Sequence, residues 1–192
     1  MRDIEIKGLC KAFDGKQVLR DFSAVLPAGQ VTGLMAPSGA GKTTLLRILM
    51  GLETQDRGII TGLDGLRLSA VFQEDRLCEN LNPVSNLRLV TPALSWEAAE
   101  AALATVGLTD CPRQPARELS GGMRRRVAIL RELLTEYDLL FLDEPFKGLD
   151  QETKEIVMAD TRRRCAGRTV LFVTHDPAEL EALGAVQRLE LS

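Results

Sequence analysis

The chain has 192 residues, the length of a single domain. Hydrophobic residues make up 45% and charged residues 27%, so the chain can bury a core and is neither disordered nor collagen-like. Its 24 basic and 27 acidic residues give a net charge of -3, which argues against broad electrostatic capture of nucleic acid or an anionic membrane. We find no signal peptide and no apolar stretch long enough to span a bilayer, and therefore expect a soluble, cytoplasmic protein.

The first part of the sequence predicts strands followed by a glycine-rich turn. Apolar residues alternate with charged ones from Ile4, and the turn Asp14-Gly15 leads into a second apolar stretch that ends before Pro27. A short apolar strand is predicted over Val31–Met35. A helix is predicted behind the turn, over residues 42–50.

The middle of the chain, from about Glu74 to Thr135, has a different composition. It contains four of the prolines and one clear predicted helix over Trp96–Val106, which Ser95 caps and Gly107 ends. Ser120 is a candidate N-cap for a further helix, whose apolar stripe runs through Val127, Leu130 and Leu134. We expect the arginine runs 124–126 and 162–164 to be solvated helix faces.

The last third alternates buried strands with helices. Strands are predicted over 139–142 and 169–174, with a helix over 151–165 between them, and Asp176, Pro177 and Glu179 form a helix-starting pattern of N-cap, proline and glutamate. This order indicates an α/β fold with a mostly parallel sheet, preceded by antiparallel strands and interrupted by a helical insert. We place the core at 1–73 and 136–192 and the insert at 74–135.

A phosphate-binding loop is predicted between the strand at 31–35 and the following helix. Glycines let backbone N–H groups surround phosphate oxygens, and the helix N-terminus adds its dipole. Lysine would reach the β- and γ-phosphates, and the threonine hydroxyl would hold Mg²⁺. The first position is alanine where the strict pattern has glycine. The predicted loop comprises Ala36, Pro37, Ser38, Gly39, Ala40, Gly41, Lys42, Thr43 and Thr44.

Two carboxylates follow the buried strand at 139–142. A strand that ends in Asp143 and Glu144 delivers both acids to the carboxyl edge of the sheet, where open α/β sheets bind ligands. Asp143 would coordinate Mg²⁺, and Glu144 would accept a proton from an attacking water. The same two residues would be an ordinary surface pair in a chain without the phosphate loop.

The stretch Leu119-Ser120-Gly121-Gly122-Met123 resembles the signature Leu-Ser-Gly-Gly-Gln of the ATP-binding cassette (ABC) ATPases. Further family motifs occur in the family's order, and the resemblance covers essentially the whole chain. It implies the P-loop NTPase fold of that family with an N-terminal antiparallel subdomain. It also implies roles for the Q-loop glutamine Gln73, the D-loop residue Asp150, the switch histidine His175 and the adenine-stacking aromatic Phe13.

The resemblance implies a Mg²⁺-dependent ATPase subunit of a transporter, most similar to small bacterial importers. Each ATP would lie between the Lys42 loop of one subunit and Ser120, Gly121 and Gly122 of another, in a homodimer or with a paired ABC ATPase. Gln73 would contact Mg²⁺ or the attacking water. Permease subunits and a substrate-binding protein are the implied partners, with no nucleic acid, and the chain would be peripheral on the inner face of the membrane.

Several alternatives remain at this point. The functional roles are favoured, but Phe13 is also compatible with a place in a core or hairpin, Gln73 with a surface position and His175 with a place in the core. The rival functions are a soluble ABC-type ATPase acting on nucleic acid or ribosomes and a subunit with little turnover, the latter motivated by Ala36 and by Met123 in place of glutamine. The sequence after Gln73 resembles importers of nitrate, sulfonates and taurine, which is the only pointer to cargo.

Overall fold

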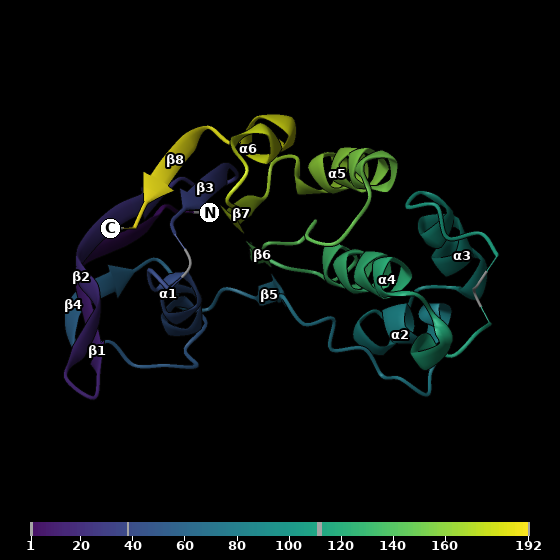
Figure 1. Cartoon of the computed structure of the whole chain (residues 1–192), viewed down its shortest axis with the longest axis horizontal. Coiled ribbons are helices and arrows are strands. Elements are labelled where there is room, and N and C mark those ends of the chain that lie inside the picture. Colours follow the sequence, from purple (N-terminus) through teal and green to yellow (C-terminus); the bar gives the residue numbers. More distant parts are fainter. Residues whose placement is uncertain (1, 38, 111–112, 192) are drawn as a thin grey trace.

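The computed structural model describes residues 2–37, 39–110 and 113–191. Two sheets form the framework (Figure 1): a three-stranded antiparallel sheet in the order β2-β1-β4 and a five-stranded sheet in the order β5-β6-β7-β3-β8. Every described pair in the larger sheet is parallel. This confirms the predicted α/β fold with a mostly parallel sheet and an antiparallel N-terminal part.

The antiparallel sheet is built from the predicted hairpin and one further strand. The hairpin strands are β1 (Ile4–Phe13) and β2 (Lys16–Leu26), which turn at Asp14 and Gly15 with positive φ angles at both. The third strand, β4 (Arg57–Thr61), pairs with the other side of β1 and was not predicted.

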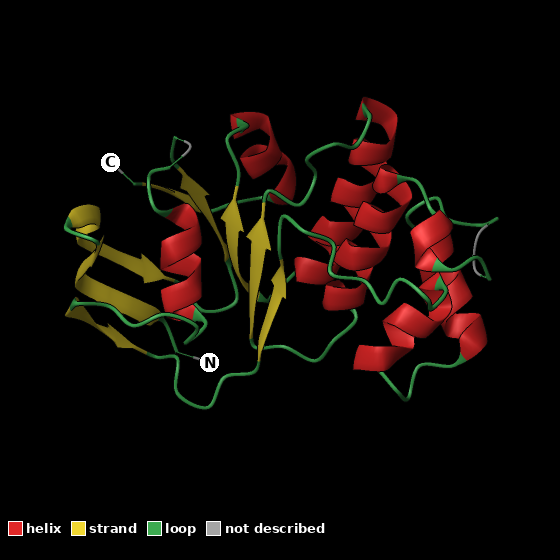
Figure 2. Ribbon diagram, turned by 60° about the horizontal axis from the view of Figure 1, so that its bottom comes forward, coloured by secondary structure: helices red, strands yellow, loops and turns green. Residues whose placement is uncertain are grey.

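The parallel sheet contains β3 (Val31–Met35), β5 (Leu68–Val71), β6 (Leu139–Asp143), β7 (Thr169–Val173) and β8 (Gln187–Glu190). Alternate residues of a strand face opposite sides of a sheet. Accordingly Leu140 and Leu142 of β6 pack into one apolar cluster, and Leu139 and Phe141 pack into a second one. The second cluster also contains α1 (Lys42–Leu49), which lies between the two sheets (Figure 2).

Five helices of the described residues lie on the other side of the parallel sheet. They are α2 (Pro83–Val90), α3 (Trp96–Ala104), α4 (Gly121–Leu133), α5 (Gln151–Cys165) and α6 (Pro177–Leu183). Of these, α2 and α3 pack against α4, and the three lie together away from the antiparallel sheet (Figure 1). The predicted caps are present, since the hydroxyls of Ser95 and Ser120 accept hydrogen bonds from the N–H groups of Ala98 and Met123 at 3.1 and 3.3 Å.

Two features of the helices differ from the sequence prediction. Helix α2 was not predicted, although Asn82 caps it by accepting from the N–H of Ser85 at 2.8 Å. At the start of α6, Glu179 does not complete a capping box: its carboxylate accepts from the Thr174 hydroxyl and pairs with Lys154. Glu179 therefore links α5 to the end of β7.

Among the helices of the described residues, none is both long and apolar enough to cross a membrane.

The variant Gly33→Ala tests the close packing of α6 on β3. A Cβ atom at this position would lie 2.6 Å from Cδ2 and 3.0 Å from Cδ1 of Leu180. Overpacking of this kind costs about 1–3 kcal/mol, so Gly33→Ala should lower the free energy of unfolding by that amount in urea titrations. Gly121→Ala is the matched control, because a Cβ there meets nothing within 4 Å. Equal stability of the two variants would contradict the packing described.

Candidate nucleotide site

The site lies at the carboxyl edge of the parallel sheet. Asp143 at the end of β6 is in register with Val173 at the end of β7, and Leu34 of β3 is also in register with Val173. The segments that follow β3, β5, β6 and β7 therefore emerge at one edge, where parallel α/β sheets bind ligands. These segments carry the phosphate loop, Gln73, Glu144 and His175.

The glycine-rich loop is held by close backbone contacts. Gly41 has a φ of 95°, and a Cβ there would lie 2.8 Å from the carbonyl oxygen of Val18 in β2, so position 41 requires glycine. Lys42 is buried, and its ammonium donates hydrogen bonds to the carbonyl oxygens of Ala36 at 2.7 Å and Pro37 at 3.1 Å. Phosphate oxygens are acceptors that this ammonium can take in exchange for the two carbonyls.

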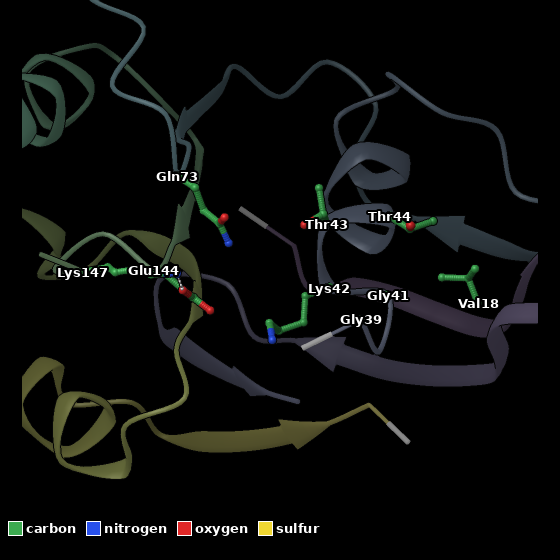
Figure 3. Close-up of a pocket in the computed structure, with 9 residues that line it drawn as sticks. All are labelled: Val18, Gly39, Gly41, Lys42, Thr43, Thr44, Gln73, Glu144 and Lys147. Atoms are coloured by element: carbon green, nitrogen blue, oxygen red, sulfur yellow. Dashed lines mark ion pairs between the residues drawn. The ribbon is translucent and has the colours of Figure 1, made fainter. Parts of the chain in front are cut away.

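A cavity of about 340 Å³ joins this loop to the ends of the neighbouring strands (Figure 3). Seven of the residues that line it belong to the two halves of the predicted site. They are Gly39, Gly41, Lys42, Thr43 and Thr44 from the phosphate loop and Gln73 and Glu144 from the ends of β5 and β6. Val18 and Lys147, which the sequence did not single out, complete the lining. The structure thus brings these seven predicted residues to one cavity.

Asp143 is only 4% exposed, and its Oδ1 atom has no hydrogen-bond partner among the described residues. Burial, together with the nearby charge of Glu144, raises the pKa of its carboxyl; Lys42, a hydrogen bond from Gln73 and Arg125 act in the opposite direction. A buried carboxylate oxygen without a partner is a suitable ligand for a cation.

The donor set fits Mg²⁺ in particular. Mg²⁺ is usually bound by one or two carboxylates together with phosphate and water oxygens, not by a complete protein cage. Across the described ranges no group of three or more His, Cys, Asp and Glu side chains could form such a cage. Asp143, with the Gln73 amide in hydrogen-bond contact, matches the sparser arrangement, and Thr43 and Gln73 both line the neighbouring cavity.

Glu144 is positioned by contacts of both its backbone and its carboxylate. Its φ is 46°, an unusual value for a residue with a side chain, and its N–H donates to the carbonyl oxygen of Val173 at 2.9 Å. Its carboxylate lies 3.2 Å from the ammonium of Lys147 and 3.9 Å from Nδ1 of His175. The side chain of His175 is exposed, and it lines an adjacent cavity with Ala36 and Pro37.

Several predicted residues are not part of this cavity. Phe13 is 42% exposed and is not among the described lining residues; the ammonium of Lys11 lies 4.9 Å from its ring centroid. Asp150 caps α5 by accepting from the N–H of Thr153 at 3.0 Å, which lowers the pKa of Asp150. Ser120, Gly121 and Gly122 begin α4 and do not line the cavity either. Ser38 lies outside the described residues.

Arg125 corrects the expectation that arginines 124–126 form a solvated face. It is 5% exposed, and its guanidinium donates to the carbonyl oxygens of Glu144 at 3.0 Å and Pro145 at 2.6 Å, and also to that of Phe72. Burial lowers the pKa of Arg125, and Asp75 opposes this shift. One side chain of α4 thus joins the segments that carry Gln73 and Glu144. Helical spacing gave the missing signal, because Arg125 precedes the buried Ile129 by four residues.

These features define a class first: a parallel α/β sheet with a phosphate loop and a strand-end carboxylate pair is a P-loop ATPase. Residues 19–147 match the ABC transporter family, and the chain belongs to that family. It is 40% identical over 190 residues to the aliphatic sulfonates import ATP-binding protein SsuB 2 of Agrobacterium fabrum, covering 94% of this chain and 73% of that protein. The corresponding SsuB of Delftia acidovorans is 39% identical over 180 residues, covering 92% and 74%.

A bacterial Atm1-family ABC exporter with ATP bound shares the fold. The TM-score is 0.85 at 23% identity, over all of this chain and 37% of the exporter. The chain is therefore a transport ATPase subunit that works with membrane permease subunits. Action on nucleic acid or ribosomes, the rival considered above, is not favoured.

Asp143→Asn tests the buried carboxylate. Because the pKa of Asp143 is raised in the folded chain, its charge lowers stability above that pKa, and this loss disappears as pH falls through it. Without nucleotide, Asp143→Asn should raise the free energy of unfolding by about 1 kcal/mol at pH 7, and the gain should shrink at acidic pH. The stabilisation by ATP with Mg²⁺ should fall in the same variant. Denaturant titrations at several pH values measure both, and a less stable apo variant would contradict the assignment.

Proposed function

We propose that this cavity binds ATP through Lys42 and the phosphate loop and that Glu144 is the general base for its hydrolysis. The observation that carries the proposal is that Lys42 and Glu144, 102 positions apart, line the same cavity. Lys42 would hold the β- and γ-phosphates, and the loop N–H groups would bind the remaining phosphate oxygens.

Hydrolysis would follow from the placement of Glu144. The oxygen of a water molecule forms a bond to the γ-phosphorus, the bond to the bridging oxygen breaks to release ADP, and the water proton passes to the Glu144 carboxylate. Gln73 lines the same cavity and would orient the water, and His175 would contact the γ-phosphate from beside Glu144. Mg²⁺, held by Asp143, Thr43 and Gln73, would neutralise phosphate charge when bound.

We further propose that the complete site forms between two copies of the chain. Ser120, Gly121 and Gly122 present the N-terminus of the 13-residue helix α4, which has free N–H groups and a dipole suited to phosphate. They do not line the cavity of their own chain, so a second copy has to supply them. Asp150 would lie at the same junction, and stacking of adenine on Phe13 remains a prediction.

Glu144→Gln tests the base and the dimer together. The variant should bind ATP, lose turnover by about a hundredfold or more, and move from monomer to dimer on size-exclusion chromatography when ATP is added. The Ser120→Arg, Glu144→Gln double variant should bind ATP as a monomer and fail to dimerise. An unchanged kcat in Glu144→Gln would remove Glu144 as the base. Loss of ATP binding by the double variant would contradict a site shared between copies.

We assign the docking of the permease to a groove next to Gln73. This groove of about 310 Å³ is lined by Leu52, Leu68 and Phe72 and by the basic Arg76 and Arg131, among others. Leu52 is largely exposed, and the guanidinium of Arg76 lies 3.8 Å from the ring centroid of Phe72. Phe72 precedes Gln73, and its carbonyl oxygen accepts a hydrogen bond from Arg125. A displacement of Phe72 on docking would therefore also move Gln73 in the nucleotide cavity.

For the cargo we propose an aliphatic sulfonate, delivered by a substrate-binding protein, with the chain on the cytoplasmic face of the membrane. The support is the similarity to the sulfonate import proteins of Agrobacterium fabrum and Delftia acidovorans. Cargo would contact the permease and the binding protein, so the residues of this chain do not select it directly.

Leu52→Glu tests the docking groove. In vesicles that contain the permease, an alkanesulfonate-loaded binding protein should stimulate ATP hydrolysis, and Leu52→Glu should reduce the ratio of stimulated to basal rate, because a carboxylate opposes apolar docking. Ile59→Glu is the matched control: Ile59 is equally apolar and exposed, but lies on β4 outside the groove. An unaffected ratio in Leu52→Glu would contradict the groove, and stimulation by other anions alone would contradict the cargo.

A further inference from the structure

Lys147 contacts the carboxylate of Glu144. Its ammonium nitrogen lies 3.2 Å from Oε2 of Glu144, and Figure 3 marks this ion pair at the wall of the nucleotide cavity. The Lys147 side chain is 64% exposed and that of Glu144 only 11%. Lys147 belongs to neither the Asp143-Glu144 pair nor the Gly148-Leu149-Asp150 motif, so the family resemblance gives it no role.

The turn that carries Lys147 is firmly placed. The N–H of Lys147 donates to the carbonyl oxygen of Glu144 at 3.3 Å, and the N–H of Leu149 donates to that of Phe146, also at 3.3 Å. Phe146 is buried and packs edge-on against Phe172, with 5.8 Å between ring centroids. The backbone thus fixes Lys147 beside Glu144, while its exposed side chain stays free to move away.

Both oxygens of Glu144 have a nitrogen neighbour in this arrangement. Oε2 pairs with Lys147, and Oε1 lies 3.9 Å from Nδ1 of His175. A general base has to offer a free lone pair to the water it deprotonates. An ammonium in contact with the carboxylate occupies such a lone pair and holds the side chain in one position.

We propose that Lys147 is a positioning residue that restrains Glu144 and thereby limits the rate of ATP hydrolysis. The proposal rests on the proposed role of Glu144 as the base. Proton transfer requires the ion pair to open, so Lys147 slows the chemical step without being needed to hold ATP. A partly exposed ion pair is weak and opens easily. Lys147 therefore slows hydrolysis moderately and does not block it.

The test compares three variants of the full chain. Lys147→Gln should raise kcat about two- to fivefold, the range that loss of a partly exposed ion pair gives, while KM for ATP changes less than twofold. Lys147→Arg keeps the charge and should stay near the wild-type rate. Lys7→Gln is the control, because Lys7 forms an exposed pair with Glu5 far from the cavity. If Lys147 had only a structural role, Lys147→Gln would not raise kcat, and the rate would not depend on whether residue 147 is charged.

Ionic strength provides a second readout. Raising it from about 0.01 to about 1 M shortens the screening length from about 30 to about 3 Å, which weakens a solvent-exposed ion pair. At saturating ATP, kcat of the wild type should therefore approach that of Lys147→Gln as salt increases. A lower kcat in Lys147→Gln, or a raised KM, would show that Lys147 assists turnover or binds phosphate, and would overturn the proposal.

The Glu144→Gln background separates this proposal from the role of Glu144. If Glu144 is the base and Lys147 restrains it, Lys147→Gln should give no increase over the residual single-turnover rate of Glu144→Gln. An increase of the same size in both backgrounds would overturn the restraint while leaving the base in place. Normal turnover by Glu144→Gln alone would instead remove the base.

Discussion

The parallel pairing of β6 between β5 and β7 is the constraint on which the site depends. Hydrogen bonding in register sets where each strand ends, and so it sets which side chains meet at the edge of the sheet. A shift of one residue would turn Asp143 to the other face and move the apolar residues of β6 out of both cores. The core packing on the two faces of β6 therefore also fixes the position of the carboxylates.

Two groups at this edge of the sheet are held in unfavourable states. Asp143 is buried with an unpartnered oxygen, and the peptide of Glu144 adopts a φ that few residues with side chains adopt. Arg125 compensates in part, because its buried guanidinium binds carbonyl oxygens on both sides of the cavity. The ammonium of Lys42 likewise donates to carbonyl oxygens of the phosphate loop. Locally unfavourable conformations of this kind are common at functional sites.

Much of the fold and site followed from local sequence signals, and what was missed depends on distant contacts. Asp143 and Glu144 stand at the end of a strongly apolar strand, and Lys42 begins the helix that follows another, so their placement could be predicted from the chain alone. Strand β5 is only four residues long and is fixed by its register with β6, which no local pattern announces. Helix α2 was missed because Pro83 suggested a break, whereas proline at the first helical position favours a helix.

Arg125 was missed for a different reason. A run of three arginines has the composition of a solvated surface, and only the position of each residue around the helix separates the buried one from its neighbours. Roles that depend on a second copy of the chain, such as those of Ser120 and Asp150, remain predictions, because a single chain does not bring these residues to the cavity.

The contact between Gly41 and Val18 has a consequence for ligand selection. The hairpin that carries Phe13 next to its turn also carries Val18, whose carbonyl oxygen would lie 2.8 Å from a Cβ at position 41 of the phosphate loop. This contact limits the change in distance between Phe13 and the phosphate loop. With the proposed stacking of adenine on Phe13, a ligand that touches both ends would need a flat base and a phosphate chain at a matching span. Free phosphate or a nucleoside alone would then contact only one of the two.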